Sequence, residues 1–266
     1  MRMLRWMIAI ALIAFVGTRA FAHESGQGLS CKAFAGEFVQ LATKNHGQFQ
    51  VYRTGPTAAA IGILLLPGRS GLDEPTLAWA DRLGAEGYRV VAVNLYGKAR
   101  APKSRAAPLN NQRRADAEER SAIHFLSAPG RKIVTLGWGS AGALQSLEAS
   151  AADSADVSGT VLFDGGVSAP ASLVQRIKSL VLLVAFNSTT PLPKLQAFEG
   201  RMRLYGKPLT VHYYNVSPKT VDPTGPDFSS SIAQEIWAQV DSFFGRVQFL
   251  CRRCAPYQNY LFDYHN

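Results

Sequence analysis

Residues 132–142, KIVTLGWGSAG, constrain the fold more than any other part of the sequence. The apolar run at the start favours a buried strand, the small residues in the middle favour a tight turn, and the stretch that follows favours a helix. A strand that turns this sharply into a helix is typical of α/β proteins, in which the turn lies at the carboxyl end of a central strand.

The turn has the pattern of a nucleophile elbow, small-x-nucleophile-x-small, written here as Gly137, Trp138, Gly139, Ser140 and Ala141. Gly139 stands at the nucleophile position and has no side chain that can attack. A residue at this position is usually held in a strained backbone conformation that costs about 1–3 kcal/mol, which glycine adopts almost freely. In the alternative frame Ser140 is the nucleophile, but bulky Trp138 then takes the first small position.

Strands and helices alternate along the rest of the chain. Apolar runs predict buried strands at residues 61–66, 90–95, 133–138, 160–163, 180–186 and 209–214. Helical spacing and helix start signals predict helices at residues 75–83, 113–127, 142–152 and 232–244. This alternation predicts a single-domain α/β fold, with a mostly parallel central sheet and helices on both faces. The order of the elements is that of an α/β-hydrolase fold.

The N-terminus has the features of a secretory signal. Arg2 and Arg5 precede an apolar run over residues 6–16, and Ala20-Phe21-Ala22 is typical of a cleavage site. We expect cleavage after Ala22, no stable membrane span in the mature chain, and a periplasmic or secreted location. The alternative is an uncleaved anchor, for which the run is short against a bilayer of about 30 Å.

Four segments follow from these patterns. Residues 1–22 are the expected signal peptide, 23–60 an N-terminal segment with the first strands, 61–246 the α/β-hydrolase domain, and 247–266 an aromatic C-terminal tail. Loss of the signal's three arginines lowers the formal charge from +9 to +6. Basic and acidic residues alternate at residues 113–120, RRADAEER, which predicts a solvated helix face and no nucleic-acid binding.

The three cysteines fit export to an oxidising compartment. Cys31 lies near the mature N-terminus, and Cys251 and Cys254 form a C-x-x-C in the tail. We expect a disulfide, either between Cys31 and the tail or within the C-x-x-C, with one thiol left over. The alternative is a redox-active pair, because Arg252 and Arg253 would favour a thiolate.

Four stretches resemble the dienelactone hydrolase family, over residues 61–244. They read GILLLPGRSGLDEPTLAWADRLGAEGYRVVAVNLYGKA, KIVTLGWGSAGALQSL, VLFDGGVSAPASLVQRIKSLVLLVAF and LQAFEGRMRLYGKPLTVHYY. The resemblance implies an α/β-hydrolase fold and hydrolysis of carboxylic esters or lactones by a Cys-His-Asp triad with a helper glutamate.

Each chemical position that the resemblance implies is filled here by another residue. The nucleophile falls on Gly139, the helper glutamate on Gly68, the acid on residues 187–188 (Asn-Ser) and the base on residues 218–219 (Pro-Lys). Acyl transfer needs a nucleophile in hydrogen-bond contact with a base. We therefore expect a degenerate member, a pseudoenzyme that has lost its triad and acts as a binding or accessory protein.

The binding architecture of the turn remains. The backbone amides of Ser140 and Arg69 form a possible cradle for an oxyanion or carboxylate. Lys98 stands where related enzymes place an arginine for the substrate carboxylate, although an exposed lysine is usually only solvated. We therefore expect a small carboxylate to be bound, not hydrolysed, by a site made of Gly68, Arg69, Lys98, Trp138, Gly139 and Ser140.

Two alternatives remain open. One is an active hydrolase with a rebuilt site of Ser140, Asp164 and Lys219, in which a desolvated lysine replaces histidine as the base. Asp164 ends a predicted strand, and we favour its interpretation as a turn or cap carboxylate. His124 and His212 are interpreted as structural.

The other alternative is a partner protein that docks on another exported protein through its aromatic tail, instead of packing that tail on its own domain. We expect neither a metal nor a cofactor, because possible ligands do not cluster with ligand spacing and no phosphate loop or dinucleotide fingerprint occurs.

Overall fold

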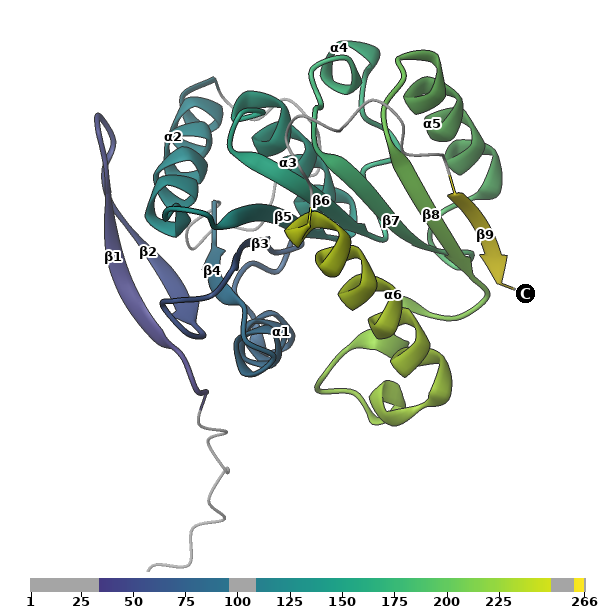
Figure 1. The fold of residues 1–266 in the computed structure, drawn as a ribbon, viewed down its shortest axis with the longest axis horizontal. Coiled ribbons are helices and arrows are strands. Elements are labelled where there is room, and N and C mark those ends of the chain that lie inside the picture. The colour runs from purple at the N-terminus through teal and green to yellow at the C-terminus, as the bar shows by residue number, and fades with distance from the viewer. Residues whose placement is uncertain (1–33, 96–108, 250–260, 266) are drawn as a thin grey trace, which may run out of the picture. The chain divides into compact units, whose positions relative to one another are not determined.

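A computed structural model describes residues 34–95, 109–249 and 261–265 (Figure 1). In these residues nine strands form one sheet in the order β1-β2-β4-β3-β5-β6-β7-β8-β9. The strands are β1 (Glu37–Thr43), β2 (Gly47–Thr54), β3 (Ile61–Leu66), β4 (Arg89–Val93), β5 (Lys132–Trp138), β6 (Val157–Phe163), β7 (Leu180–Phe186), β8 (Leu209–Tyr214) and β9 (Leu261–His265). The β1–β2 and β2–β4 pairs are antiparallel, and all other pairs are parallel.

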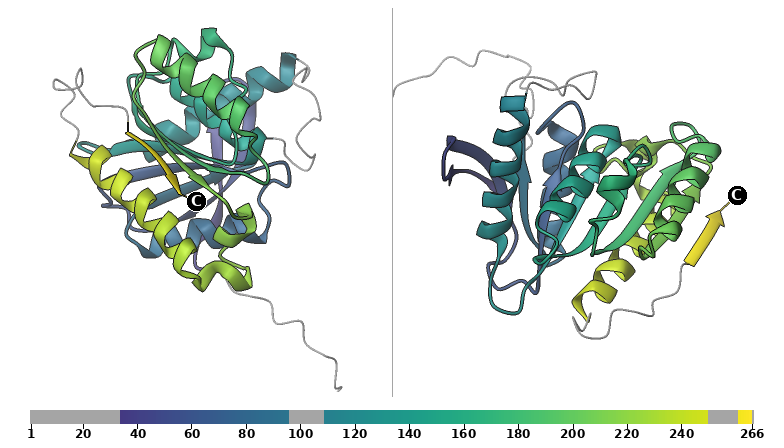
Figure 2. Two further views of the ribbon diagram at one scale, coloured as in Figure 1. Left: turned by 90° about the vertical axis from the view of Figure 1, so that its right-hand side faces the viewer. Right: turned by 90° about the horizontal axis from the view of Figure 1, so that it is seen from above.

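Helices cover both faces of this sheet (Figures 1 and 2). They are α1 (Glu74–Ala85), α2 (Leu109–Leu126), α3 (Gly139–Ala152), α4 (Ala171–Val174), α5 (Leu192–Leu204) and α6 (Ser231–Gln248), with short 3-10 helices η1 (Pro218–Val221) and η2 (Pro226–Ser229). Buried residues of α1 and α6 pack in one apolar cluster on one face, whereas α2 to α5 pack on the other. The predicted α/β fold, with a mostly parallel sheet between two helical layers, is confirmed.

Local signals explain where the helices that flank the site begin. Asp73 caps α1 by accepting a hydrogen bond from the Thr76 amide at 3.1 Å, and a proline lies in the first turn. Ser230 caps α6 in the same way, through the Ala233 amide at 3.3 Å. The α3 helix starts at Gly139, three residues earlier than predicted, because the elbow turn leads into the helix at once.

The structure corrects the interpretation of residues 113–120 as a solvated helix face. This stretch lies within α2, which begins at Leu109, before the predicted start. Glu118 and Glu119 are buried, with only 5% and 4% of their surface exposed. The sequence pattern could not reveal this burial, because it comes from the packing of α2 against the sheet and α3.

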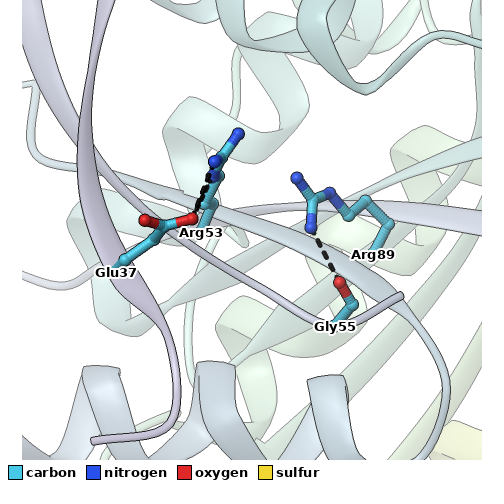
Figure 3. A network of polar contacts seen from close by, with 4 residues as sticks. All are labelled: Glu37, Arg53, Gly55 and Arg89. Atoms are coloured by element: carbon cyan, nitrogen blue, oxygen red, sulfur yellow. Dashed lines mark hydrogen bonds and ion pairs between the residues drawn. The ribbon is translucent and has the colours of Figure 1, made fainter. Parts of the chain in front are cut away.

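Charged side chains stabilise the antiparallel β1–β2 hairpin and join it to β4 (Figure 3). Arg53 forms an ion pair with Glu37, directly opposite on β1, at 2.7 Å. Arg89 of β4 donates a hydrogen bond to the Gly55 carbonyl at 2.7 Å, and the guanidinium groups of both arginines lie 6.0 Å from the Phe125 ring of α2. The hairpin is therefore held in a defined position beside α2.

The last described strand belongs to the C-terminal tail. β9 pairs in parallel with β8, with Thr210 opposite Leu261 and Tyr214 opposite His265 (Figure 2). Part of the tail thus extends the chain's own sheet. No helix in the described ranges is long and apolar enough to cross a membrane. Several predicted features lie outside the described residues: the signal peptide at 1–22, Lys98, Cys31, Cys251 and Cys254.

Candidate functional site

The turn between β5 and α3 has the backbone geometry of a nucleophile elbow. Gly139 has a φ of +64°, in the left-handed region that glycine tolerates and other residues rarely adopt. A Cβ atom added to Gly139 would have no heavy atom within 4 Å, so the space above the turn is open. Gly142 lets α3 approach β3, since a Cβ there would lie 2.3 Å from the Leu66 carbonyl oxygen. Glycine therefore occupies the left-handed position of this turn, and Ser140 follows it as the next residue.

A cavity of about 410 Å³ opens above this turn. Three segments far apart in the sequence meet there: the loop after β3 with the start of α1, the elbow, and η1. The lining residues are Leu65, Pro67, Gly68, Arg69, Ser70, Asp73, Pro75, Thr76, Trp79, Trp138, Gly139, Ser140, Pro218, Lys219 and Asp222. The five predicted binding residues that the structure describes thus line one cavity, and Lys98 lies outside the described residues.

One wall of the cavity is aromatic. Trp79 of α1 is 4% exposed and packs against Trp138 and Trp237, with ring centroids 5.6 Å and 4.7 Å apart. Trp138 in turn stacks on Phe163 at 4.9 Å. The Trp79 Nε1 atom is buried and has no hydrogen-bond partner in the described chain. Sequence reasoning missed Trp79, because the apolar spacing of its helix indicates only a core-facing position.

The charged side chains at the cavity differ in whether they already form hydrogen bonds or ion pairs. Asp73 accepts hydrogen bonds from the Thr76 amide and hydroxyl, the latter at 2.6 Å. Asp222 likewise accepts from the amide and hydroxyl of Thr224, at 2.9 and 2.7 Å. The Lys219 ammonium makes no hydrogen bond or ion pair with any described residue. Lys219 therefore supplies positive charge that an anionic ligand can use.

Asp164 of the alternative rebuilt site has a different environment. It follows β6 with a φ of 55°, and it accepts hydrogen bonds from the hydroxyls of Thr189 and Thr190, the latter at 3.3 Å. Burial raises the pKa of its carboxyl, and the two threonine bonds oppose that change. Asp164 is not among the cavity-lining residues, whereas Ser140 and Lys219 are. The structure brings these two residues to one cavity and bonds Asp164 to the loop after β7.

The family resemblance places the acid of the triad at residues 187–188 and the base at residues 218–219, and these two positions have different surroundings. The Asn187 side chain donates a hydrogen bond to the Asn215 side chain, which joins the loops after β7 and β8. Pro218 opens η1, whose cap Ser217 accepts from the Lys219 amide at 3.3 Å. Residues 218–219 line the cavity and residue 187 does not.

No histidine lines the cavity in the described part of the chain. His212 is 5% exposed within β8, with its ring 6.3 Å from that of Tyr214, and His124 is exposed on α2. Within the described ranges, no three His, Cys, Asp or Glu side chains are grouped so that they could hold a metal ion.

Comparisons with known proteins connect this site to one family. The sequence profile described as "Dienelactone hydrolase family" matches residues 49–248. No match was found among curated proteins.

Solved structures share the fold. A structure named m3DLH is 20% identical and has a TM-score of 0.63, covering 80% of this chain and 99% of its own. A dienelactone-hydrolase-like promiscuous phosphotriesterase from metagenomic libraries is 19% identical, with a TM-score of 0.60 and the same two coverages. An esterase from Pyrococcus furiosus is 13% identical, with a TM-score of 0.62, covering 80% of this chain and 91% of its own. At these identities the likeness shows the α/β-hydrolase fold and nothing finer.

Proposed function

Since this chain belongs to the dienelactone hydrolase family and has glycine at its elbow, we propose that it binds a small carboxylate without hydrolysing an ester. The observation that carries the proposal is the left-handed Gly139, with open space above it and no reactive side chain. A protease stripped of its triad keeps only a residual rate of about 10³–10⁴ over water, from oxyanion binding. We therefore propose that the elbow cavity binds its ligand and leaves it chemically unchanged.

Two features of the cavity support a carboxylate as the ligand. The Ser140 amide lies in the first turn of α3, where backbone N–H groups have no partner within the helix, and the cap residue Trp138 adds no side-chain bond. Lys219 brings an unpaired ammonium to the same cavity. The two groups together would hold an anionic head at the elbow.

The walls indicate the rest of the ligand. Trp79, Trp138 and the prolines make them largely apolar and flat. The volume of about 410 Å³ falls within the range of about 300–1,000 Å³ that is usual for small-molecule sites. An aromatic monocarboxylate, with its ring against the indoles, fits these properties better than a short aliphatic acid does.

We also propose that the protein acts outside the cytoplasm, after cleavage at Ala22. The basic and apolar pattern of residues 1–22 and the three cysteines support this proposal. N-terminal sequencing of the exported protein would check it, and recovery of an intact residue 1–22 segment would contradict it.

The test combines equilibrium binding with an ester assay on the mature protein. Benzoate should quench the tryptophan fluorescence and bind about tenfold more tightly than neutral benzamide, because the charge pairs with Lys219. Lys219→Met should weaken benzoate about tenfold, whereas Lys194→Met, on the exposed surface of α5, should not. Any residual turnover of p-nitrophenyl acetate should be unchanged in Ser140→Ala, because the proposal gives no side chain the role of nucleophile. Absence of benzoate binding up to about 10 mM, a concentration far above weak specific affinities, would overturn the proposal.

The second candidate is an active ester or lactone hydrolase with a rebuilt site. The observation in its favour is that Ser140, exposed at the turn, lines the same cavity as Lys219. Turnover that is lost in Ser140→Ala and retained in Ser70→Ala would support it and remove the first proposal. Ser70 is the matched control, because it lines the same cavity from the loop after β3.

A further inference from the structure

A second hollow, of about 580 Å³, lies between the β1–β2 hairpin and α2. We call it the α2 groove. It is lined by Ala42, Lys44, Asn45, His46, Arg113, Asp116, Ala117, Arg120, Ser121 and His124. The residues from α2 recur at helical spacing, so they form one continuous face opposite the hairpin turn.

The lining of the α2 groove is strongly basic. Lys44, Arg113 and Arg120 are cationic, two histidines add basic imidazoles, and Asp116 is the one acid among the lining residues. An Asp116 oxygen already accepts a hydrogen bond from the Gln112 amide at 2.9 Å, and Arg120 lies 3.4 Å from Asp153.

Four of these basic side chains make no bond with the described chain: Lys44, His46, Arg113 and His124. They come from both walls of the groove. An isolated exposed lysine is usually only solvated, but basic side chains gathered from two elements around one hollow form a positive field that attracts anions.

The groove is formed before any ligand arrives. The Thr43 hydroxyl accepts from the His46 amide at 2.8 Å and donates to the Gly47 carbonyl at 3.0 Å, which fixes the hairpin turn. Val39 and Leu41 of the hairpin pack against the apolar cluster that contains Ile123 of α2. The ion pairs and hydrogen bonds of Figure 3 hold the base of the same hairpin. Ligand binding therefore needs little ordering of the walls.

The Glu119 carboxyl of α2 is buried and does not line the groove. Burial, together with the negative Asp116, Glu148 and Asp153, raises the pKa of this carboxyl well above its usual range. Asp116, the one acid that lines the groove, already accepts a hydrogen bond from Gln112.

We propose that the α2 groove binds a phosphate group carrying more than one negative charge, such as pyrophosphate or a phosphate monoester. Unpaired basic groups on both walls call for an anion with several oxygens and more than a single charge, which a monocarboxylate cannot offer. A soluble phosphate compound and the phosphate monoester head group of phosphatidic acid share this chemistry. The inference is independent of the carboxylate proposal, because the groove and the elbow cavity have no lining residue in common.

Calorimetric titration of the mature protein with pyrophosphate at low salt tests the site. The double variant Lys44→Gln/Arg113→Gln should weaken binding by about tenfold or more, since two charge-assisted contacts are lost. The matched control is Arg176→Gln/Lys178→Gln, which removes the same charge at exposed positions outside the groove and should change the affinity by less than about twofold. Equal losses in both variants, or no binding of pyrophosphate by the parent protein, would overturn the proposal.

Flotation with vesicles identifies the source of the phosphate. If the ligand is a lipid, the protein should float with phosphatidic acid vesicles and not with phosphatidylcholine vesicles, and only the groove variant should lose this association. Pyrophosphate binding without flotation would assign the groove to a soluble phosphate compound. Equal melting temperatures for the parent and both variants would show that the substitutions leave the fold intact.

Discussion

The elbow cavity and the α2 groove offer a ligand opposite kinds of surface. The cavity has indole rings, prolines and equal numbers of basic and acidic side chains, whereas the groove has basic side chains on both walls and one acid. The cavity opens above the turn between β5 and α3, where Gly139 and Ser140 line it. The groove is formed by one face of α2 and by the β1–β2 hairpin, and none of its lining residues lines the elbow cavity. From this contrast we expect apolar contact to dominate ligand affinity in the cavity and charge to dominate it in the groove.

The aromatic wall gives the largest expected effect. Trp79→Ala should lower the free energy of unfolding by about 3–5 kcal/mol, because it removes a buried ring that packs against Trp138, Phe163 and Trp237. Urea unfolding would measure the loss. Phe249→Ala is the control, since that side chain is 83% exposed and its removal should cost less than about 0.5 kcal/mol. A similar loss in both variants would contradict the central role of Trp79 in the cavity wall.

The elbow itself can be tested with two glycine substitutions. Gly139→Ala should destabilise the protein by about 1–2 kcal/mol, because alanine is strained at a left-handed φ although the space is open. Gly200→Ala, inside α5 and also free of close contacts, should instead stabilise it by about 0.5–1 kcal/mol. Thermal unfolding should therefore move in opposite directions for the two variants. Equal stabilisation by both would show that the turn does not hold Gly139 in this conformation.

Salt should weaken ligand binding at the two sites to different extents. Raising NaCl from about 50 to 500 mM should weaken pyrophosphate in the α2 groove by about tenfold, because exposed charges are screened within several ångströms. Benzoate in the elbow cavity should weaken by less than about threefold, since apolar contact with the indoles persists. Paired titrations at the two salt concentrations measure the difference. A steeper salt dependence for benzoate would reverse the comparison.

The smallest expected effect concerns Asp164, which lies behind the elbow and outside the cavity lining. Because burial raises its folded-state pKa, its contribution to stability is fully present below the unfolded-state pKa and declines as pH rises through the folded-state pKa. Asp164→Asn should remove this decline, which begins as the pH rises above about 4, the ordinary pKa of an aspartate. Asparagine also tolerates the positive φ found here.

Unfolding measured across this pH range would check the prediction for Asp164. Benzoate affinity is the second measurement and should stay within about twofold of the parent protein, since the carboxyl does not reach the ligand. A large loss of benzoate binding in Asp164→Asn would contradict this prediction and indicate that Asp164 takes part in ligand binding.

The strands and the elbow were predictable because their signals are local. The runs at Leu180–Phe186 and Leu209–Tyr214 have the predicted bounds, since strands buried on both faces are continuously apolar. The short α4 and the helix α5 were not predicted. The α5 sequence, LPKLQAFEGRMRL, contains an internal glycine and three basic residues, and its apolar face emerges only where it packs against the sheet.

The sequence by itself determined the alternation of strands and helices, the sharp turn at the end of β5, and the glycine at position 139. These features depend on residue type and on neighbours along the chain. Only the tertiary structure decided that Trp79 and Lys219 line the same cavity, that Asp164 is bonded to Thr189 and Thr190, and that Glu119 is buried while Arg113 faces a groove. Burial and electrostatic surroundings depend on segments distant in the sequence, so local patterns could not reveal them.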